Sequence, residues 1–134
     1  MRYHSIVILL LLFLAGCGRG HVQLSGTVVF ADDGSPVTKG SVIFSTPTFQ
    51  ARGDLDDQGR FTMGSFGQRD GFPPGTYQVG VAGAIVSDPS GARFYDLLAE
   101  DWRDPSTSGF ELTIDQNTRD LEIRVERNPA PRPW

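Results

Sequence analysis

The sequence contains a single cysteine, Cys17, among its 134 residues. One thiol cannot form an intrachain disulfide, which excludes a disulfide-stapled fold. The chain has no run of Lys or Arg and its formal net charge is −4, so the composition argues against nucleic acid as a partner. The longest apolar run, residues 6–15, is too short for a transmembrane helix, which needs about 20 residues.

The N-terminus has the features of an export signal. Arg2 supplies a positive charge before the apolar run, which is typical of a secretory signal peptide. The run ends in Leu-Ala-Gly-Cys at residues 14–17, which closely resembles the bacterial lipobox. This resemblance implies that residues 1–16 are a lipoprotein signal peptide, that Cys17 carries diacylglycerol and an acylated amine, and that residues 17–21 tether the protein to a membrane. The alternative is an ordinary signal peptide whose cysteine is incidental.

The rest of the chain consists largely of short segments in which apolar and polar residues alternate. A period of two is typical of half-buried β-strands, and the sixteen glycines and nine prolines of the chain suit the turns between them. We predict seven strands, at residues 22–30, 40–45, 51–55, 60–66, 76–86, 110–114 and 121–127. They indicate an all-β fold, a seven-stranded antiparallel β-sandwich over residues 22–127.

Two segments depart from this alternation. Residues 93–102 are the only helix that the pattern predicts, because they place four residues at rough helical spacing: Phe94, Leu97, Leu98 and Asp101. A helix of this length is marginal alone and must pack on something. Residues 128–134 contain three prolines, so we expect an extended and mobile C-terminal tail.

Two turns stand at the centre of the chain. Asp56 can accept hydrogen bonds from backbone N–H groups at the start of one turn, and Gly59 can supply the positive φ at its end. Pro74 and Gly75 have the composition of a type II turn, in which Gly75 would take the positive φ. Both turns connect predicted strands, as in antiparallel β-structure.

The residues around these turns resemble a known family. The pattern D-x-x-G-R-F at residues 56–61, followed by P-P-G-x-Y-x-V at residues 73–79, is similar to the signature of carboxypeptidase regulatory-like, or transthyretin-like, β-sandwich domains. Residues 26–44 resemble the opening hairpin of that family, and residues 104–109 are similar to a segment of small lipoproteins from planctomycete-type bacteria. The resemblance implies a transthyretin-like (prealbumin or Ig-like) sandwich that serves as an accessory domain and not as a catalytic one.

Few residues are available for chemistry. Once the leader is removed and Cys17 is acylated, His21 is the only histidine, so neither the usual zinc site nor a Ser-His-Asp triad on a rigid scaffold can be assembled. We expect no enzyme activity, no metal and no cofactor. Residues 54–59 resemble part of a calcium loop, but Ser65 stands where that loop needs a bidentate Glu. Lys39, the only lysine, lies in a turn segment, which argues against an isopeptide bond from a core strand.

Three aromatic residues, Phe94, Tyr95 and Trp102, lie in the segment without alternation. Aromatic side chains dominate recognition surfaces, because they bury a large area at a low cost in conformational entropy. They therefore form the candidate binding surface. The alternative is that they plug the open end of the sandwich.

These observations predict a lipid-anchored, non-catalytic protein of the cell envelope whose sandwich supports or binds a neighbouring protein or glycan. The alternative is a periplasmic lipoprotein that binds a small molecule and uses residues 87–109 as a lid. Gly18 stands where some lipoproteins carry the aspartate that retains them in the inner membrane, so analogy slightly favours the outer membrane.

Overall fold

The computed structural model describes residues 21–63 and 73–134. Its elements in chain order are β1 (Leu24–Phe30), β2 (Ser41–Ser45), β3 (Gln50–Asp54), β4 (Arg60–Met63), β5 (Gly75–Ala82), β6 (Ile85–Ser87), β7 (Phe94–Asp96), the 3-10 helix η3 (Glu100–Arg103), β8 (Glu111–Ile114) and β9 (Thr118–Val125). The predicted signal peptide, Cys17 and residues 64–66 of the fourth predicted strand lie outside the described residues.

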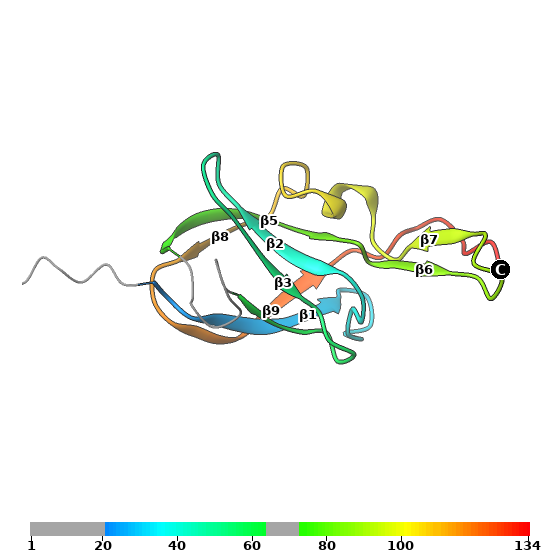
Figure 1. The fold of residues 1–134 in the computed structure, drawn as a ribbon, viewed down its shortest axis with the longest axis horizontal. Helices are drawn as coiled ribbons and strands as arrows, with labels where there is room; N and C mark the ends of the chain where they lie inside the picture. Colours follow the sequence, from blue (N-terminus) through cyan, green and yellow to red (C-terminus); the bar gives the residue numbers. More distant parts are fainter. Residues whose placement is uncertain (1–20, 64–72) are drawn as a thin grey trace, which may run out of the picture.

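Two sheets form the body of the molecule, and a narrow ribbon extends from it (Figure 1). One sheet has the strand order β4-β1-β9 and the other the order β3-β2-β5-β8, while β6 and β7 pair with each other. Seven strands thus build the two sheets, and each corresponds to one predicted strand. The described residues are mostly β, with η3 as a short exception.

The prediction that all strands pair antiparallel was wrong for one pair. β1 and β9 pair in parallel, with Val28 opposite Ile123 and Phe30 opposite Val125. The strands lie near the two ends of the chain, so no hairpin turn dictates their relative direction. A sequence-local turn fixes antiparallel pairing, whereas strands far apart in sequence are free to pair either way. The other sheet pairs are antiparallel, as expected.

The core lies between the two sheets and follows the predicted alternation. Tyr77, Val79 and Val81 of β5 are buried, as are Leu24 and Val28 of β1. A buried aliphatic side chain contributes about 1.5–3 kcal/mol through removal of its surface from water. Phe44 packs edge-on against Tyr77, with ring centroids 6.0 Å apart. This packing holds the two central strands of the larger sheet.

The predicted fifth strand, residues 76–86, is divided into β5 and β6. Gly83 between them has a φ of +75°, a left-handed conformation that glycine adopts without a Cβ clash. Here the chain leaves the larger sheet, and β6 continues outside the body (Figure 1). The irregular Gly83 thus starts the ribbon.

The predicted helix at residues 93–102 was wrong. Phe94–Asp96 forms β7, paired antiparallel with β6, and only residues 100–103 wind into a 3-10 turn. After β7 the backbone again pairs with a distant segment, since Leu98 forms a β-bridge with Arg127 and Ala99 N–H donates to the Glu126 carbonyl at 2.9 Å. A helix of two to three turns has little stability of its own, so strand pairing determines its conformation.

The turn around Asp56 was predicted correctly. Its Oδ1 accepts hydrogen bonds from the backbone N–H groups of Gln58 and Arg60 at 2.8 and 2.9 Å, and Gly59 has a φ of +74°. The type II turn at Pro74-Gly75 was wrong. Gly75 is the first residue of β5 and pairs with Ile114, and it is not among the residues of positive φ.

Candidate functional site

The structure does not bring the three predicted aromatic residues onto one surface. Trp102, in η3, is only 9% exposed and packs against Phe110 with ring centroids 5.5 Å apart. Phe94, in β7, is 68% exposed, and Tyr95 beside it is partly buried. Trp102 therefore belongs to the core, and Phe94 to the surface.

The burial of Trp102 bears on the small-molecule alternative. Residues 104–105 pass so close over Gly80 of β5 that a Cβ there would lie 2.6 Å from the Pro105 nitrogen. Ser108 closes the same loop by donating to the Val79 carbonyl. The segment after β7 is thus packed flat on β5, with Trp102 filling the space, which argues against a lid over an apolar cavity.

Phe94 lies on a projection that we call the arm, defined as residues 84–97 together with residues 128–134. β6 and β7 form its two strands, and the C-terminal tail runs beside β7 (Figure 1). Asn128 joins the tail to the ribbon, because its backbone N–H donates to the Leu97 carbonyl at 3.0 Å and its Nδ2 donates to the Asp96 carbonyl at 2.9 Å. The tail that we expected to be mobile is therefore hydrogen-bonded along β7.

The tail covers one face of the arm. The Tyr95 hydroxyl donates to the Asn128 and Ala130 carbonyls, and the Arg132 guanidinium lies over the Tyr95 ring, 5.6 Å from its centroid. The same guanidinium lies 5.8 Å from the centroid of Trp134. Cation–π contacts are significant within about 6 Å. Tyr95 is thus a support for the tail and not a free contact residue.

The other face of the arm is open. In the ribbon Ile85 lies opposite Asp96, and Ser87 opposite Phe94, so these four residues share a face, while Val86 and Tyr95 share the covered one. Ile85 is 45% exposed. The open face therefore carries Ile85 and Phe94, two of the most exposed large apolar side chains of the described chain.

Sequence reasoning found Phe94 but missed Ile85 and Trp134, which is 37% exposed. Ile85 follows the last predicted inward residues of the fifth strand, so the alternation assigned it to the sandwich. The signal that identifies the arm is Gly83, which separates Ile85 and Val86 from β5.

The charged side chains at the tip of the arm interact with one another and with nearby polar groups of the arm. Arg93 lies 3.9 Å from Asp88 and donates through Nη1 to the Pro133 carbonyl at 3.2 Å. The Ser90 hydroxyl donates to Asp88 at 2.7 Å and is the main cause that lowers the pKa of this carboxyl, with backbone N–H groups of the turn adding to it. At the base, Arg103 lies 3.4 Å from Asp96.

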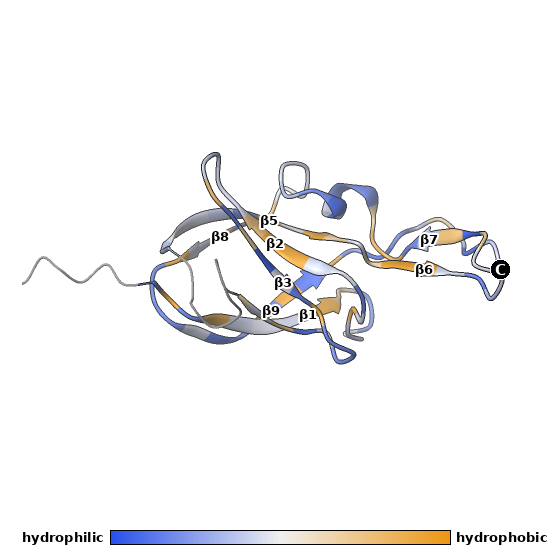
Figure 2. Ribbon diagram, in the orientation of Figure 1, coloured by the Kyte–Doolittle hydropathy of each residue, from blue (hydrophilic) through white to orange (hydrophobic). Residues whose placement is uncertain are grey.

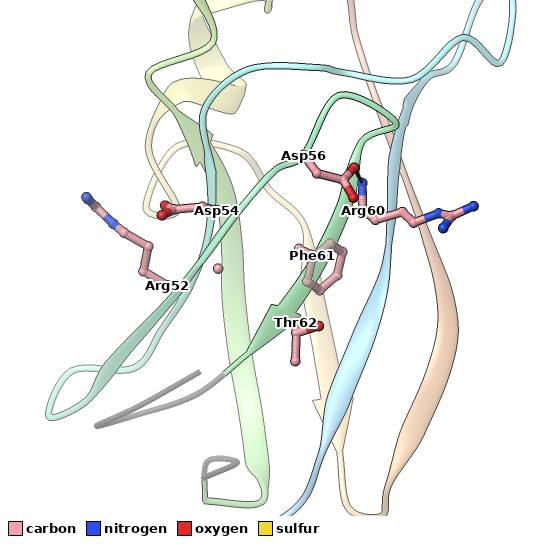
Figure 3. A pocket seen from close by; sticks show the side chains of 7 residues that line it. Arg52, Asp54, Asp56, Arg60, Phe61 and Thr62 are labelled. Carbon is pink, nitrogen blue, oxygen red and sulfur yellow. Dashed lines mark hydrogen bonds between the residues drawn. The ribbon is translucent and has the colours of Figure 1, made fainter. Parts of the chain in front are cut away.

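A shallow hollow of about 480 Å³ lies between β3 and β4 (Figure 3). Asp54 and Asp56 line it, together with Arg52 and Arg60, whose guanidinium groups point in opposite directions. Asp54 accepts a hydrogen bond from the Ser41 hydroxyl at 2.6 Å. The backbone N–H groups of Arg60 and Gln58 lower the pKa of Asp56. Asp54 and Asp56 of the calcium-like segment thus serve the local strand pairing and the turn.

The remaining candidates for chemistry are apart from one another. His21 is exposed at the start of the described chain and lines a separate hollow of about 500 Å³ with Pro73 and Pro74. Lys39 is exposed. Among residues 21–63 and 73–134, no group of three or more His, Cys, Asp or Glu is placed to hold a metal ion. Nor does the described part contain a helix long and apolar enough to cross a membrane.

Comparison with known proteins gives a similarity of fold only. No protein-family model matches the sequence, and no curated protein matches it. A solved structure with a similar fold is that of the major pilin subunit of Bacillus cereus, which is 15% identical with a TM-score of 0.48. The similarity covers 81% of this chain and 30% of the pilin chain. The two packed sheets establish the β-sandwich on their own, and the comparisons assign the chain to no family.

Proposed function

We propose that this protein is a lipid-anchored, non-catalytic module of the cell envelope that binds a neighbouring protein or glycan through its arm. One observation carries the proposal. The start of the described chain lies at one end of the molecule, and the arm with the C-terminus lies at the other (Figure 1). An anchor just before residue 21 would therefore leave the arm pointing away from the membrane.

The length of the tether supports this arrangement. Residues 17–21 would span at most about 3.3–3.6 Å each when fully extended. The sandwich would then sit close to the bilayer, with the arm at its distal end. Acylation of Cys17 at both its thiol and its amine supplies more than one lipid chain, and two or more chains anchor a protein stably.

The arm has the composition of a recognition element. Phe94 offers a large exposed ring on a two-stranded ribbon, on the same face as Ile85. Exposed aromatic side chains that enter a partner surface dominate the energy of many interfaces, and they also stack on sugar rings. The turn and pairing roles of Asp54, Asp56 and Asp88 favour a binding role over catalysis.

The anchor is tested by growth with a clickable fatty acid. The wild-type chain should become labelled and fractionate with membranes, whereas Cys17→Ser should remain unlabelled and unprocessed. Labelling of the Cys17→Ser chain would contradict the anchor.

Binding is tested by chemical crosslinking in intact envelopes. Phe94→Ser should lose the crosslinked species that wild type forms, while Thr113→Ser, an exposed substitution on β8, should retain them. Identical crosslinks from wild type and Phe94→Ser would exclude the arm as the binding element.

A further inference from the structure

One edge of the arm has unpaired backbone groups. Leu97 N–H donates to the Ala84 carbonyl, and Asp88 N–H donates to the Arg93 carbonyl. In residues 84–88, which contain β6, the even-numbered residues therefore direct their backbone N–H and C=O groups towards β7. In an antiparallel ladder the alternate residues then direct their N–H and C=O groups to the opposite edge. Those residues are Ile85 and Ser87, and within the described chain no strand pairs with that edge.

This edge differs from the four edges of the sandwich. The outermost strands of the two sheets are β3, β4, β8 and β9. Each carries exposed charged side chains: Arg52 and Asp54, Arg60, Glu111, and Arg119, Asp120, Glu122 and Arg124. Charges on edge strands discourage pairing with another chain. β6 reads Ile-Val-Ser and has no charge, and it is among the most hydrophobic segments of the ribbon (Figure 2).

Charge also separates the arm from the rest of the molecule. The arm contains two basic side chains, Arg93 and Arg132, and two acidic ones, Asp88 and Asp96. The other described residues contain seven basic and thirteen acidic side chains, a balance of −6. Two copies that approached through their bodies would repel each other, whereas two arms meet without net repulsion.

We propose that β6 pairs with β6 of a second copy, antiparallel about a two-fold axis at Val86. This deepens the proposed function, because it names the partner of the arm. A strand edge is self-complementary in this arrangement. The Ile85 backbone of each copy exchanges hydrogen bonds with the Ser87 backbone of the other copy. Ile85 then lies on the same face as Ser87 and Phe94 of the second copy, in one row across the joined sheet. In this row Ser87 of the second copy lies between Ile85 of the first copy and Phe94 of the second. Its small side chain leaves space for the Phe94 ring to approach Ile85.

The direction of β6 determines the shape of this dimer. β6 runs along the long axis of the molecule, away from the body (Figure 1). An antiparallel partner therefore places its body beyond the tip of the first arm, with the two acidic bodies and the two chain starts at opposite ends. With anchored chains, such a dimer would join two facing membrane surfaces.

The contact area sets the strength of the dimer. β6 has three residues, far fewer than the roughly 20–30 residues per partner in a standard stable interface. We therefore expect a weak dimer in solution. Many copies on facing surfaces would strengthen it, because each pair formed raises the effective concentration of the next.

Disulfide trapping tests the pairing directly. In the proposed register Val86 lies opposite its own copy as a non-hydrogen-bonded pair, with a Cα separation of about 4.5 Å, within the range of about 4.4–6.8 Å that a disulfide requires. The full chain with Cys17→Ser has no other thiol. In mild detergent, Val86→Cys in that background should form a covalent dimer on mild oxidation.

Two single-cysteine chains in the same background are matched controls. Ser87→Cys lies one residue away on the same strand, where the two copies of the residue are not opposite each other. Thr113→Cys lies on β8, a charged edge. Val86→Cys should react about tenfold faster than either, because its thiols are held together in the dimer, whereas the controls depend on random collision. Addition of Ile85→Lys to Val86→Cys should remove this advantage.

Equal rates for the three cysteine chains would overturn self-pairing. If the crosslinks that depend on Phe94 persist in envelopes in that case, the arm binds a different partner and the proposed function stands. If Val86→Cys dimerises but Cys17 is never acylated, self-pairing stands and the membrane anchor fails.

Discussion

Arg127 lies over the ring of Phe30, with its Cζ atom 3.7 Å from the ring centroid. Its Nε also donates to Asp32 at 2.9 Å, and Nη2 lies 3.3 Å from Asp33. Arg127 comes directly before the tail, while Phe30 ends β1 and the two aspartates form the following turn. One side chain thus connects the start of the tail to the β1 end of the sandwich.

We predict that Arg127→Ala lowers the free energy of unfolding by roughly 1–2 kcal/mol, because a partly exposed cation–π contact contributes about 0.5–1 kcal/mol and an exposed ion pair about 0.2–1 kcal/mol. Urea unfolding of the purified chain measures the change. Arg124→Ala removes an exposed pair with Glu122 and should change the free energy by less than about 0.5 kcal/mol. Equal effects of the two substitutions would show that Arg127 has no special role.

Acid should destabilise the protein through its aspartate turns. Hydrogen bonds lower the pKa values of four carboxyls, chiefly from Ser35 to Asp33, from the Arg60 N–H to Asp56, from Ser90 to Asp88 and from the Ser106 N–H to Asp104. A carboxyl whose pKa is lower in the folded protein than in the unfolded protein stabilises the folded state at pH values above its unfolded pKa. This contribution disappears as the pH falls from about 4, the ordinary aspartate value, through the folded pKa.

The test compares thermal midpoints at pH 7 and pH 3. The thermal midpoint of the wild-type protein should fall further from pH 7 to pH 3 than that of the chain with all four aspartates changed to Asn. The reason is that Asn cannot be protonated in this range. Asp57→Asn is the control, because Asp57 has no hydrogen bond through its side chain in the described structure and should leave the pH dependence unchanged. A fourfold variant as acid-sensitive as wild type would refute the explanation.

The sandwich could be predicted because its signals are local. The alternation in β1, β5 and β9 depends on which residues face the core, and the Asp56–Gly59 turn depends on four adjacent residues. The parallel pairing of β1 with β9 could not be predicted, because it joins segments about a hundred residues apart. At Pro74-Gly75 the sequence predicts a turn, but Gly75 pairs with Ile114 as the first residue of β5. The Tyr77 hydroxyl donates a hydrogen bond to the Pro73 carbonyl just before it.

The arm could not be predicted for a similar reason. Phe94, Leu97 and Leu98 have helical spacing, yet each is paired with a distant part of the chain. Phe94 lies opposite Ser87 in the ribbon, the Leu97 backbone bonds to Ala84 and Asn128, and Leu98 forms a β-bridge with Arg127. Neither partner segment has a periodic pattern of its own, since β6 has three residues and the tail is rich in proline. The candidate site was therefore only partly visible in the sequence, through the exposed aromatic Phe94.

Gly59 should tolerate substitution poorly, because both its backbone conformation and its surroundings disfavour a side chain. Its φ is +74°, and a Cβ there would lie 2.8 Å from the Val28 carbonyl oxygen, a backbone atom. We predict that Gly59→Ala lowers the free energy of unfolding by about 2–4 kcal/mol, since left-handed strain contributes roughly 1–2 kcal/mol and the clash adds to it. Urea unfolding measures the loss.

Two other glycines separate strain from packing. Gly34 has a φ of +72°, but a Cβ added there would have no atom within 4 Å, so Gly34→Ala should show the strain alone, roughly 1–2 kcal/mol. Gly75 has neither strain nor a close contact, its nearest neighbour being a Tyr77 ring atom at 3.8 Å. Gly75→Ala should therefore be neutral or stabilising by up to about 1 kcal/mol. If Gly59→Ala and Gly34→Ala are equal, the close approach to Val28 has no energetic weight.

Truncation of Trp102 should destabilise the fold strongly, whereas truncation of Phe94 should leave its stability almost unchanged. Trp102 is 9% exposed and contacts Phe110, so Trp102→Ala should lower the free energy of unfolding by about 3–5 kcal/mol, as for a large core residue. Phe94 is 68% exposed, and Phe94→Ala should change it by less than about 0.5 kcal/mol. Fluorescence gives an independent measurement in the Trp134→Phe background, where Trp102 is the only tryptophan. Its emission should be blue-shifted and protected from iodide quenching. Red, readily quenched emission together with a small loss on truncation would place Trp102 at the surface, and the packing of η3 on β5 would then be wrong.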